Sequence, residues 1–116
     1  MSNKTTNNDL RQPTQFLYLT TMGRKTARQY TIEIWFIKYN TRYYIISEHK
    51  KASDWVQNII FDPNVSFEVN NKTYKGYARL VDKSKESILA NAVSDLMFSK
   101  YRWNDGLIVE ITSKYN

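Results

Sequence analysis

The sequence predicts a mainly β fold, in which six antiparallel strands form a barrel closed by two helices. Short runs rich in β-branched and aromatic residues recur along the chain, separated by short polar turns. Two other segments repeat apolar residues at helical spacing. With 116 residues the chain fits one domain. We expect a flexible polar tail over residues 1–13 and the barrel domain over residues 14–116.

The first half of the domain is predicted to be a meander of three strands. These strands cover residues 15–22, 29–38 and 42–48. Gly23 opens the first turn and residues 39–41 form the second. In the middle strand Ile32, Ile34 and Phe36 alternate with other residues, so one face of this strand points toward a core.

A short helix follows the meander. Ser53 suits the N-cap, Asp54 suits the first turn, and Pro63 prevents extension. A hairpin of strands 65–69 and 72–81 comes next, turning at Asn70-Asn71, residues that tolerate positive φ.

The second strand of this hairpin carries small residues, Gly76 and Ala78, on one face, which predicts close approach of another element. Residues 84–101 carry a continuous apolar stripe and are predicted to be the longer helix. Residues 107–112 form the last strand.

Composition limits the partners and the chemistry. The formal charge of +6 and a pI near 9.5 favour an anionic partner. The chain has no cysteine and one histidine, which excludes thiolate and His-rich metal sites, so no metal ligand is predicted. No apolar run approaches the roughly 20 residues that span a bilayer. We therefore expect a cytoplasmic protein without a membrane partner.

The cations point to a phosphate site. Arg24, Lys25 and Arg28 lie on the first turn, and Lys50 and Lys51 follow the third strand. In a meander the third strand ends beside the first turn, where the short helix also begins, and a helix start favours anions. Three nearby hydroxyls supply further donors, from Thr20, Thr21 and Thr26.

Two blocks of sequence carry a family resemblance. The stretch LTTMGRKTARQYTIEIWFI resembles the L-T-T-x-G-R-K-[ST]-G-x-x-R motif of deazaflavin (F420)-dependent nitroreductase-like oxidoreductases. The stretch WVQNIIFDPNVSFEVNNKTY is similar to their W-x-x-N-L-x-x-[ND]-P-x-V-x-V block. The likeness covers roughly residues 16–112. It implies the split β-barrel of FMN-binding, pyridoxamine-phosphate-oxidase-like proteins.

The resemblance also implies a cofactor, F420 or FMN, and suggests which residues hold it. Arg24, Lys25 and Thr26 match the cationic turn and would contact the phosphate or acidic tail, while Trp55 and Asn58 would border the pocket. Ala27 stands where glycine is usual, and the loop EHKKASD is shorter than the family loop around the deazaflavin tail, which keeps FMN in consideration beside F420.

The remaining assignments extend the predicted site. Lys50 and Lys51 are assigned to the acidic group, and the middle of the second strand to the flanks of the ring. The full set of candidate cofactor-binding residues is Thr20, Thr21, Arg24, Lys25, Thr26, Arg28, Ile34, Trp35, Phe36, His49, Lys50, Lys51, Trp55 and Asn58. No catalytic residue is predicted, because the hydride chemistry would belong to the cofactor.

These features favour an oxidoreductase that transfers hydride between F420 or FMN and a small molecule, which the sequence does not identify. One alternative is a nucleic-acid-binding β-barrel that uses the cations and interleaved aromatic residues. Another is a relative that binds the cofactor without catalysis. Split barrels often pair, so a homodimer is the expected assembly.

Overall fold

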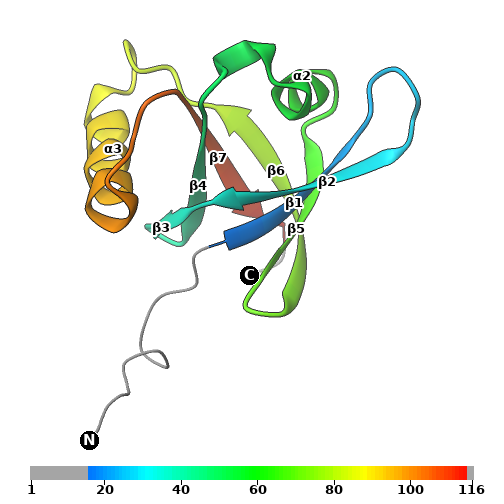
Figure 1. The fold of residues 1–116 in the computed structure, drawn as a ribbon, viewed down its shortest axis with the longest axis horizontal. Helices are drawn as coiled ribbons and strands as arrows, with labels where there is room; N and C mark the ends of the chain where they lie inside the picture. The colour runs from blue at the N-terminus through cyan, green and yellow to red at the C-terminus, as the bar shows by residue number, and fades with distance from the viewer. Residues whose placement is uncertain (1–15, 115–116) are drawn as a thin grey trace, which may run out of the picture.

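Seven strands make one antiparallel sheet that curls into a half-barrel in the part of the chain described by this computed structural model, residues 16–114 (Figure 1). The strands are β1 (Phe16–Met22), β2 (Gln29–Trp35), β3 (Ile37–Tyr39), β4 (Arg42–Ser47), β5 (Asn64–Val69), β6 (Lys72–Leu80) and β7 (Leu107–Ser113). The helices are α2 (Asp54–Phe61), α3 (Ser87–Tyr101) and a short 3-10 helix, η2 (Lys50–Ala52). The predicted tail, residues 1–13, lies outside the described residues.

The predicted antiparallel barrel with two main helices is confirmed, but it has seven strands instead of six. The predicted strand over residues 29–38 divides at Phe36 into β2 and β3. β2 pairs with β1, whereas β3 pairs with β4. The sheet order is β2-β1-β5-β6-β7-β4-β3. The two edge strands, β2 and β3, therefore follow each other directly in the chain. Because those edges are joined by one residue, the sheet has to curl back on itself.

The division at Phe36 is held by the end of α3. The Tyr101 hydroxyl accepts a hydrogen bond from the Phe36 backbone N–H (3.0 Å) and donates one to its carbonyl oxygen (2.7 Å). The Lys100 ammonium donates to the same carbonyl at 3.0 Å. These side chains bond backbone groups that the neighbouring strands would otherwise pair.

Two hairpins turn through residue pairs with positive φ. Asn70 and Asn71 have φ values of 54° and 64°, which confirms the predicted turn between β5 and β6. Asn40 and Thr41 connect β3 to β4 with φ values of 50° and 67°. Positive φ at both central residues is the geometry of a type I′ turn.

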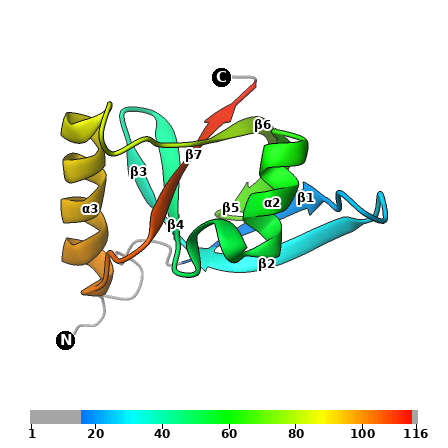
Figure 2. The same ribbon diagram turned by 90° about the horizontal axis from the view of Figure 1, so that it is seen from above.

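The sheet buries apolar side chains on both faces, and each face has its own helix (Figure 2). Inside the barrel, Ile59 of α2 joins a core with Leu17, Leu19, Phe36, Ile45, Val65, Phe67, Val69, Ala78, Val109 and Ile111. On the other face, α3 packs through Ala90, Val93 and Met97 against Ile37, Tyr44, Ile46, Val81 and Ile108. In residues 16–114, no helix has the length and hydropathy needed to cross a bilayer.

The small residues of β6 allow the close approach that the sequence predicts. A Cβ atom added at Gly76 would lie 2.5 Å from the backbone oxygen of Thr112, on the paired strand β7. No real Cβ tolerates such a contact, so this position requires glycine.

The longer helix begins at Ser87, three residues later than the sequence predicts. The Asp82 carboxylate accepts hydrogen bonds from the backbone N–H and the hydroxyl of Ser84, at 2.9 Å and 2.6 Å. This local turn competes with helix formation, which explains the later start.

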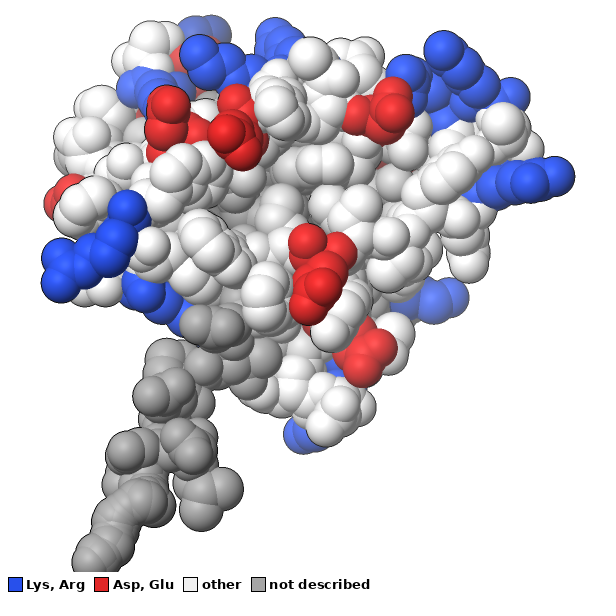
Figure 3. Space-filling view, viewed as in Figure 1, with Lys and Arg blue, Asp and Glu red and all other residues white. Residues whose placement is uncertain are grey.

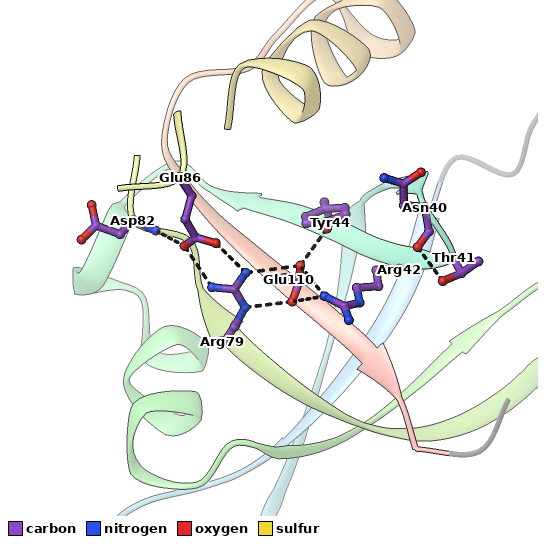
Figure 4. Close-up of polar contacts among 8 residues, drawn as sticks. All are labelled: Asn40, Thr41, Arg42, Tyr44, Arg79, Asp82, Glu86 and Glu110. Atoms are coloured by element: carbon purple, nitrogen blue, oxygen red, sulfur yellow. Dashed lines mark hydrogen bonds and ion pairs between the residues drawn. The ribbon is translucent and has the colours of Figure 1, made fainter. Parts of the chain in front are cut away.

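A buried carboxylate ties the strands beneath α3 together (Figure 4). Glu110 of β7 is 3% exposed. Tyr44 donates a hydrogen bond to it at 2.7 Å, the Arg79 Nε donates at 2.8 Å, and Arg42 lies 3.4 Å away. Arg79 also forms two hydrogen bonds with Glu86, just before α3. The network therefore joins β4, β6 and β7 to the start of the helix.

Candidate functional site

The cationic turn between β1 and β2 is fastened to α2 through Asn58. The Asn58 Oδ1 accepts hydrogen bonds from the Arg24 backbone N–H (3.2 Å) and guanidinium (2.9 Å). Its Nδ2 donates to the Thr21 hydroxyl at 3.1 Å. Asn58 is only 4% exposed, so these bonds satisfy a polar group inside the protein. The beginning of α2 and the turn therefore meet, as the sequence predicts.

Arg24 differs from its neighbours because its charge is already paired. Its guanidinium lies 3.3 Å from the carboxylate of Asp54, the first residue of α2. Lys25 and Arg28 are exposed, and no carboxylate in residues 16–114 forms an ion pair with either. Arg24 thus braces the turn, while the other two cations remain available to an anion.

The turn, the first half of β2 and α2 enclose a hollow of about 460 Å³, which we call the cationic hollow. Its lining residues are Gly23, Arg24, Lys25, Thr26, Tyr30, Thr31, Ile32, Asp54, Trp55 and Asn58. Figure 3 shows basic side chains at the end of the molecule where the β1–β2 hairpin projects.

A second hollow, the aromatic hollow, has a volume of about 520 Å³. It is lined by Phe16, Glu33, Ile34, Trp35, Ile46, Ser47, Glu48, His49, Ser53, Trp55 and Trp103. The two hollows adjoin, because Trp55 lines both and because Ile32 and Ile34 take alternate positions on one face of β2. We call the two neighbouring hollows together the groove, with a basic end and an aromatic end.

The end of α3 and the segment after it support one wall of the aromatic end. Arg102 adopts a left-handed conformation (φ 62°) that ends the helix and folds the chain back. Tyr101 stacks on Trp35 with 4.6 Å between ring centroids and 6° between planes. Trp103 meets Trp35 edge to face at 6.1 Å. These contacts hold the Trp35 ring in place at the end of β2.

Two titratable groups, Lys100 and Tyr101, bond to the backbone of Phe36, next to Trp35. Burial raises the pKa of Tyr101, which outweighs the opposite effect of its backbone hydrogen bond at Phe36. The hydroxyl therefore stays protonated at neutral pH. Burial lowers the pKa of Lys100, whose ammonium lies 4.2 Å from the centre of the Phe36 ring.

The structure brings together part of the predicted site. Arg24, Lys25, Thr26, Trp55 and Asn58 line the cationic hollow. The predicted residues that line the aromatic hollow are Ile34, Trp35, His49 and Trp55, and Trp55 lines the cationic hollow as well.

Lys50 and Lys51 do not join the cationic turn. They line a third hollow with Asp82, Lys83 and Gly106. The predicted meander does not extend to the third strand, because β4 pairs with β7 and β3 instead of with β2, and these lysines do not line the cationic hollow.

Four other predicted residues line neither end of the groove. Thr20 bonds to Thr31 at 2.7 Å, and Thr21 is buried against Asn58. Phe36 lies in the barrel core, and Arg28 stands exposed on the turn.

Several groove residues were not predicted. Tyr30 and Ile32 line the cationic hollow, and Glu33 and Glu48 line the aromatic hollow. The alternation along β2 was the available signal, since it places Tyr30, Ile32 and Ile34 on one face. Trp103, which follows the longer helix, also lines the aromatic hollow and meets Trp35 edge to face.

A model of the F420H(2)-dependent quinone reductases matches residues 2–106. The chain belongs to this family. A search of curated proteins gave no match.

Solved structures share the fold at low sequence identity. A conserved hypothetical protein of Mycobacterium tuberculosis is 18% identical with a TM-score of 0.69, covering 86% of this chain and 73% of its own. A putative pyridoxamine 5'-phosphate oxidase of Listeria innocua is 15% identical, with a TM-score of 0.65 and coverage of 86% and 84%. An F420-H2 dependent reductase, FDR-A, is 19% identical, with a TM-score of 0.56 and coverage of 84% and 92%. These likenesses confirm the split-barrel fold.

Proposed function

We propose that this protein is an oxidoreductase that binds F420 or FMN in the groove and transfers a hydride between this cofactor and a small molecule. The observation that carries the proposal is the junction at Trp55 of a cationic and an aromatic hollow. Such a groove suits a ligand with a flat ring at one end and an acidic group at the other. Membership of the F420H(2)-dependent quinone reductase family supports this cofactor class.

The basic end fits the acidic part of the cofactor. Lys25 is an exposed cation without a partner in the described residues, and the Thr26 hydroxyl lies beside it. The turn that carries both is fixed to α2 through Arg24 and Asn58, so the cation is presented by a braced segment. Charge-assisted bonds to a phosphate or carboxylate are roughly twice as strong as neutral ones.

The junction of the two hollows fits the ring. Ile32 and Ile34 offer an apolar strip along β2, and Trp55 covers the junction. In this arrangement Trp35 and Trp103, farther along the groove, remain for the second reactant. Once bound, the cofactor supplies the hydride chemistry. The protein orients the two rings and keeps water from the space between them.

Cofactor titration tests this proposal and separates F420 from FMN. Binding of either one would quench tryptophan fluorescence, because Trp55 borders both hollows. We expect one of the two to bind at micromolar or lower concentration and, when reduced, to be oxidised in the presence of a quinone. Failure of both cofactors to bind would contradict the proposal. Binding without turnover would indicate a relative that holds the cofactor without catalysis.

A nucleic-acid-binding role has less support. The turn cations and the lysines at positions 50 and 51 line different hollows, whereas a single strand is bound along one basic groove. Salt-dependent binding of single-stranded DNA or RNA would favour this alternative.

We also propose a homodimer in the cytoplasm. Large apolar side chains stand exposed, among them Ile60, Phe61 and Ile88, and covering them would bury apolar surface. One structural neighbour, 17% identical with a TM-score of 0.60, is described as a domain-swapped dimer. Light scattering on the eluting protein would give twice the 13.8 kDa chain mass.

A further inference from the structure

The aromatic hollow carries negative charge that its own lining does not neutralise. Its lining residues include Glu33 of β2 and Glu48 just after β4, both exposed, and no lysine or arginine. The Tyr18 hydroxyl lies 3.5 Å from the Glu33 carboxylate. Within residues 16–114 neither carboxylate has an ion-pair partner. The groove is therefore basic at one end and acidic at the other.

The same hollow gathers all the indole rings of the protein. The chain has three tryptophans, and Trp35, Trp55 and Trp103 all line this space. They come from β2, from α2 and from the segment after α3, so the fold brings them together from distant parts of the sequence. Tryptophan faces stack on flat rings and attract cations.

We propose that the aromatic hollow selects planar aromatic ligands that carry a positive charge, with Glu33 and Glu48 as its specificity-determining residues. The inference rests on the proposed function in treating this ligand as the hydride acceptor. A singly charged acceptor that takes up one hydride, two electrons with one proton from the reduced cofactor, becomes neutral. The carboxylates then hold the reduced product less tightly than the oxidised acceptor, which favours its release.

Two dyes of nearly equal shape isolate the effect of charge. The N-methylphenazinium cation and neutral phenazine are titrated into the protein without cofactor, at pH 8. Tryptophan fluorescence reports binding at this hollow, and calorimetry checks the result without optical interference. We expect the cation to bind about five- to tenfold more tightly, and the difference to shrink in high salt.

Variants assign the preference to the two carboxylates. The double variant Glu33→Gln/Glu48→Gln should bring the two dissociation constants within about twofold of each other, while phenazine affinity stays the same. The matched control Glu68→Gln/Asp95→Asn removes the same formal charge outside the hollow and should keep the preference. Each single variant should lose part of the preference, which provides a test if the double variant folds poorly.

The outcomes separate this inference from the proposed function. A charge preference that is absent, or that survives the double variant, overturns the inference, as does failure of either dye to bind saturably. If F420 or FMN binds but the preference is missing, only the specificity assignment is wrong. If the preference is present but neither cofactor binds, the hollow is a site for cationic aromatic ligands and the proposed function is wrong.

Discussion

At the scale of single residues, the motif that resembles the reductase family serves structure as well as binding. Arg24 and Thr21 both bond to Asn58, so these predicted cofactor contacts already have partners inside the protein. Lys25, on the same turn, has no ion-pair partner in residues 16–114 and remains available to a ligand. Sequence comparison alone does not distinguish a residue that braces the turn from one that binds the cofactor, because both roles require the same residue types in the same places.

Asn58→Ala should lower the free energy of unfolding by about 2–3 kcal/mol, because it removes three hydrogen bonds and leaves the buried Thr21 hydroxyl without its partner. Urea denaturation measures the change. Asn91→Ala, at an exposed position on α3, is the matched control and should stay within about 0.5 kcal/mol of the native protein. An equal effect of both substitutions would rule out the proposed bracing.

Thr41→Gly should stabilise the protein by about 0.5–1 kcal/mol. Thr41 is β-branched and holds a φ of 67°, and Asn-Gly is the preferred pair for this turn. The same change at Thr73, within β6, should destabilise the protein by a similar amount. Thermal unfolding followed by circular dichroism distinguishes the two signs. A lower melting temperature for Thr41→Gly would contradict the turn assignment.

At the scale of elements, most strands and both main helices were predictable because their signals are local. Alternation marks β5, the Asn70-Asn71 pair marks its turn, and Pro63 limits α2. The division between β2 and β3 was not predictable, because the run around Phe36 has uniform β propensity. What favours the break is a bond to Tyr101, which lies 65 residues away along the chain.

Tyr101→Phe tests this long-range bond. The ring can still stack on Trp35, but the Phe36 backbone groups lose their hydroxyl partner, so we expect a loss of about 1–3 kcal/mol in unfolding free energy. Hydrogen exchange at the Phe36 amide should also become faster. Tyr77→Phe, on the exposed side of β6, is the control and should have little effect. Unchanged exchange at Phe36 would contradict the role given to the hydroxyl.

The Glu110 network makes stability fall in acid. Burial alone would raise the pKa of Glu110, but hydrogen bonds from Arg79 and Tyr44 and the nearby cations outweigh it and lower the pKa below its usual value of 4.5. A lowered pKa means that the stability contributed by this group is present above that value and is lost as the pH falls through the folded-state pKa. Arg79 likewise lowers the pKa of Glu86, to about 2.

Glu110→Gln should therefore destabilise the protein at pH 7 by about 2 kcal/mol, and the gap to the native protein should narrow as the pH falls below 4.5. Denaturant unfolding between pH 7 and pH 3 provides the measurement. A gap that stays constant across this range would show that the Glu110 charge does not contribute as described.

At the scale of the whole molecule, the groove depends on how the sheet closes. The cations of the first turn and the start of α2 were correctly predicted to meet, since a hairpin and a following helix constrain them. The position of Lys50 and Lys51 was not predictable, because it depends on the bend at Phe36 and on the pairing of β4 with β7. The distribution of these cations over the surface therefore depends on how the barrel closes.

The measurement that tests the central claim most directly compares Lys25→Ala with Lys51→Ala for binding of the tighter of F420 and FMN. Both lysines are exposed, both are candidates by sequence, and only Lys25 lines the groove that meets the aromatic hollow at Trp55. We predict that the dissociation constant rises about tenfold for Lys25→Ala and less than twofold for Lys51→Ala. Equal effects, or a larger effect at Lys51, would contradict the placement of the cofactor in this groove.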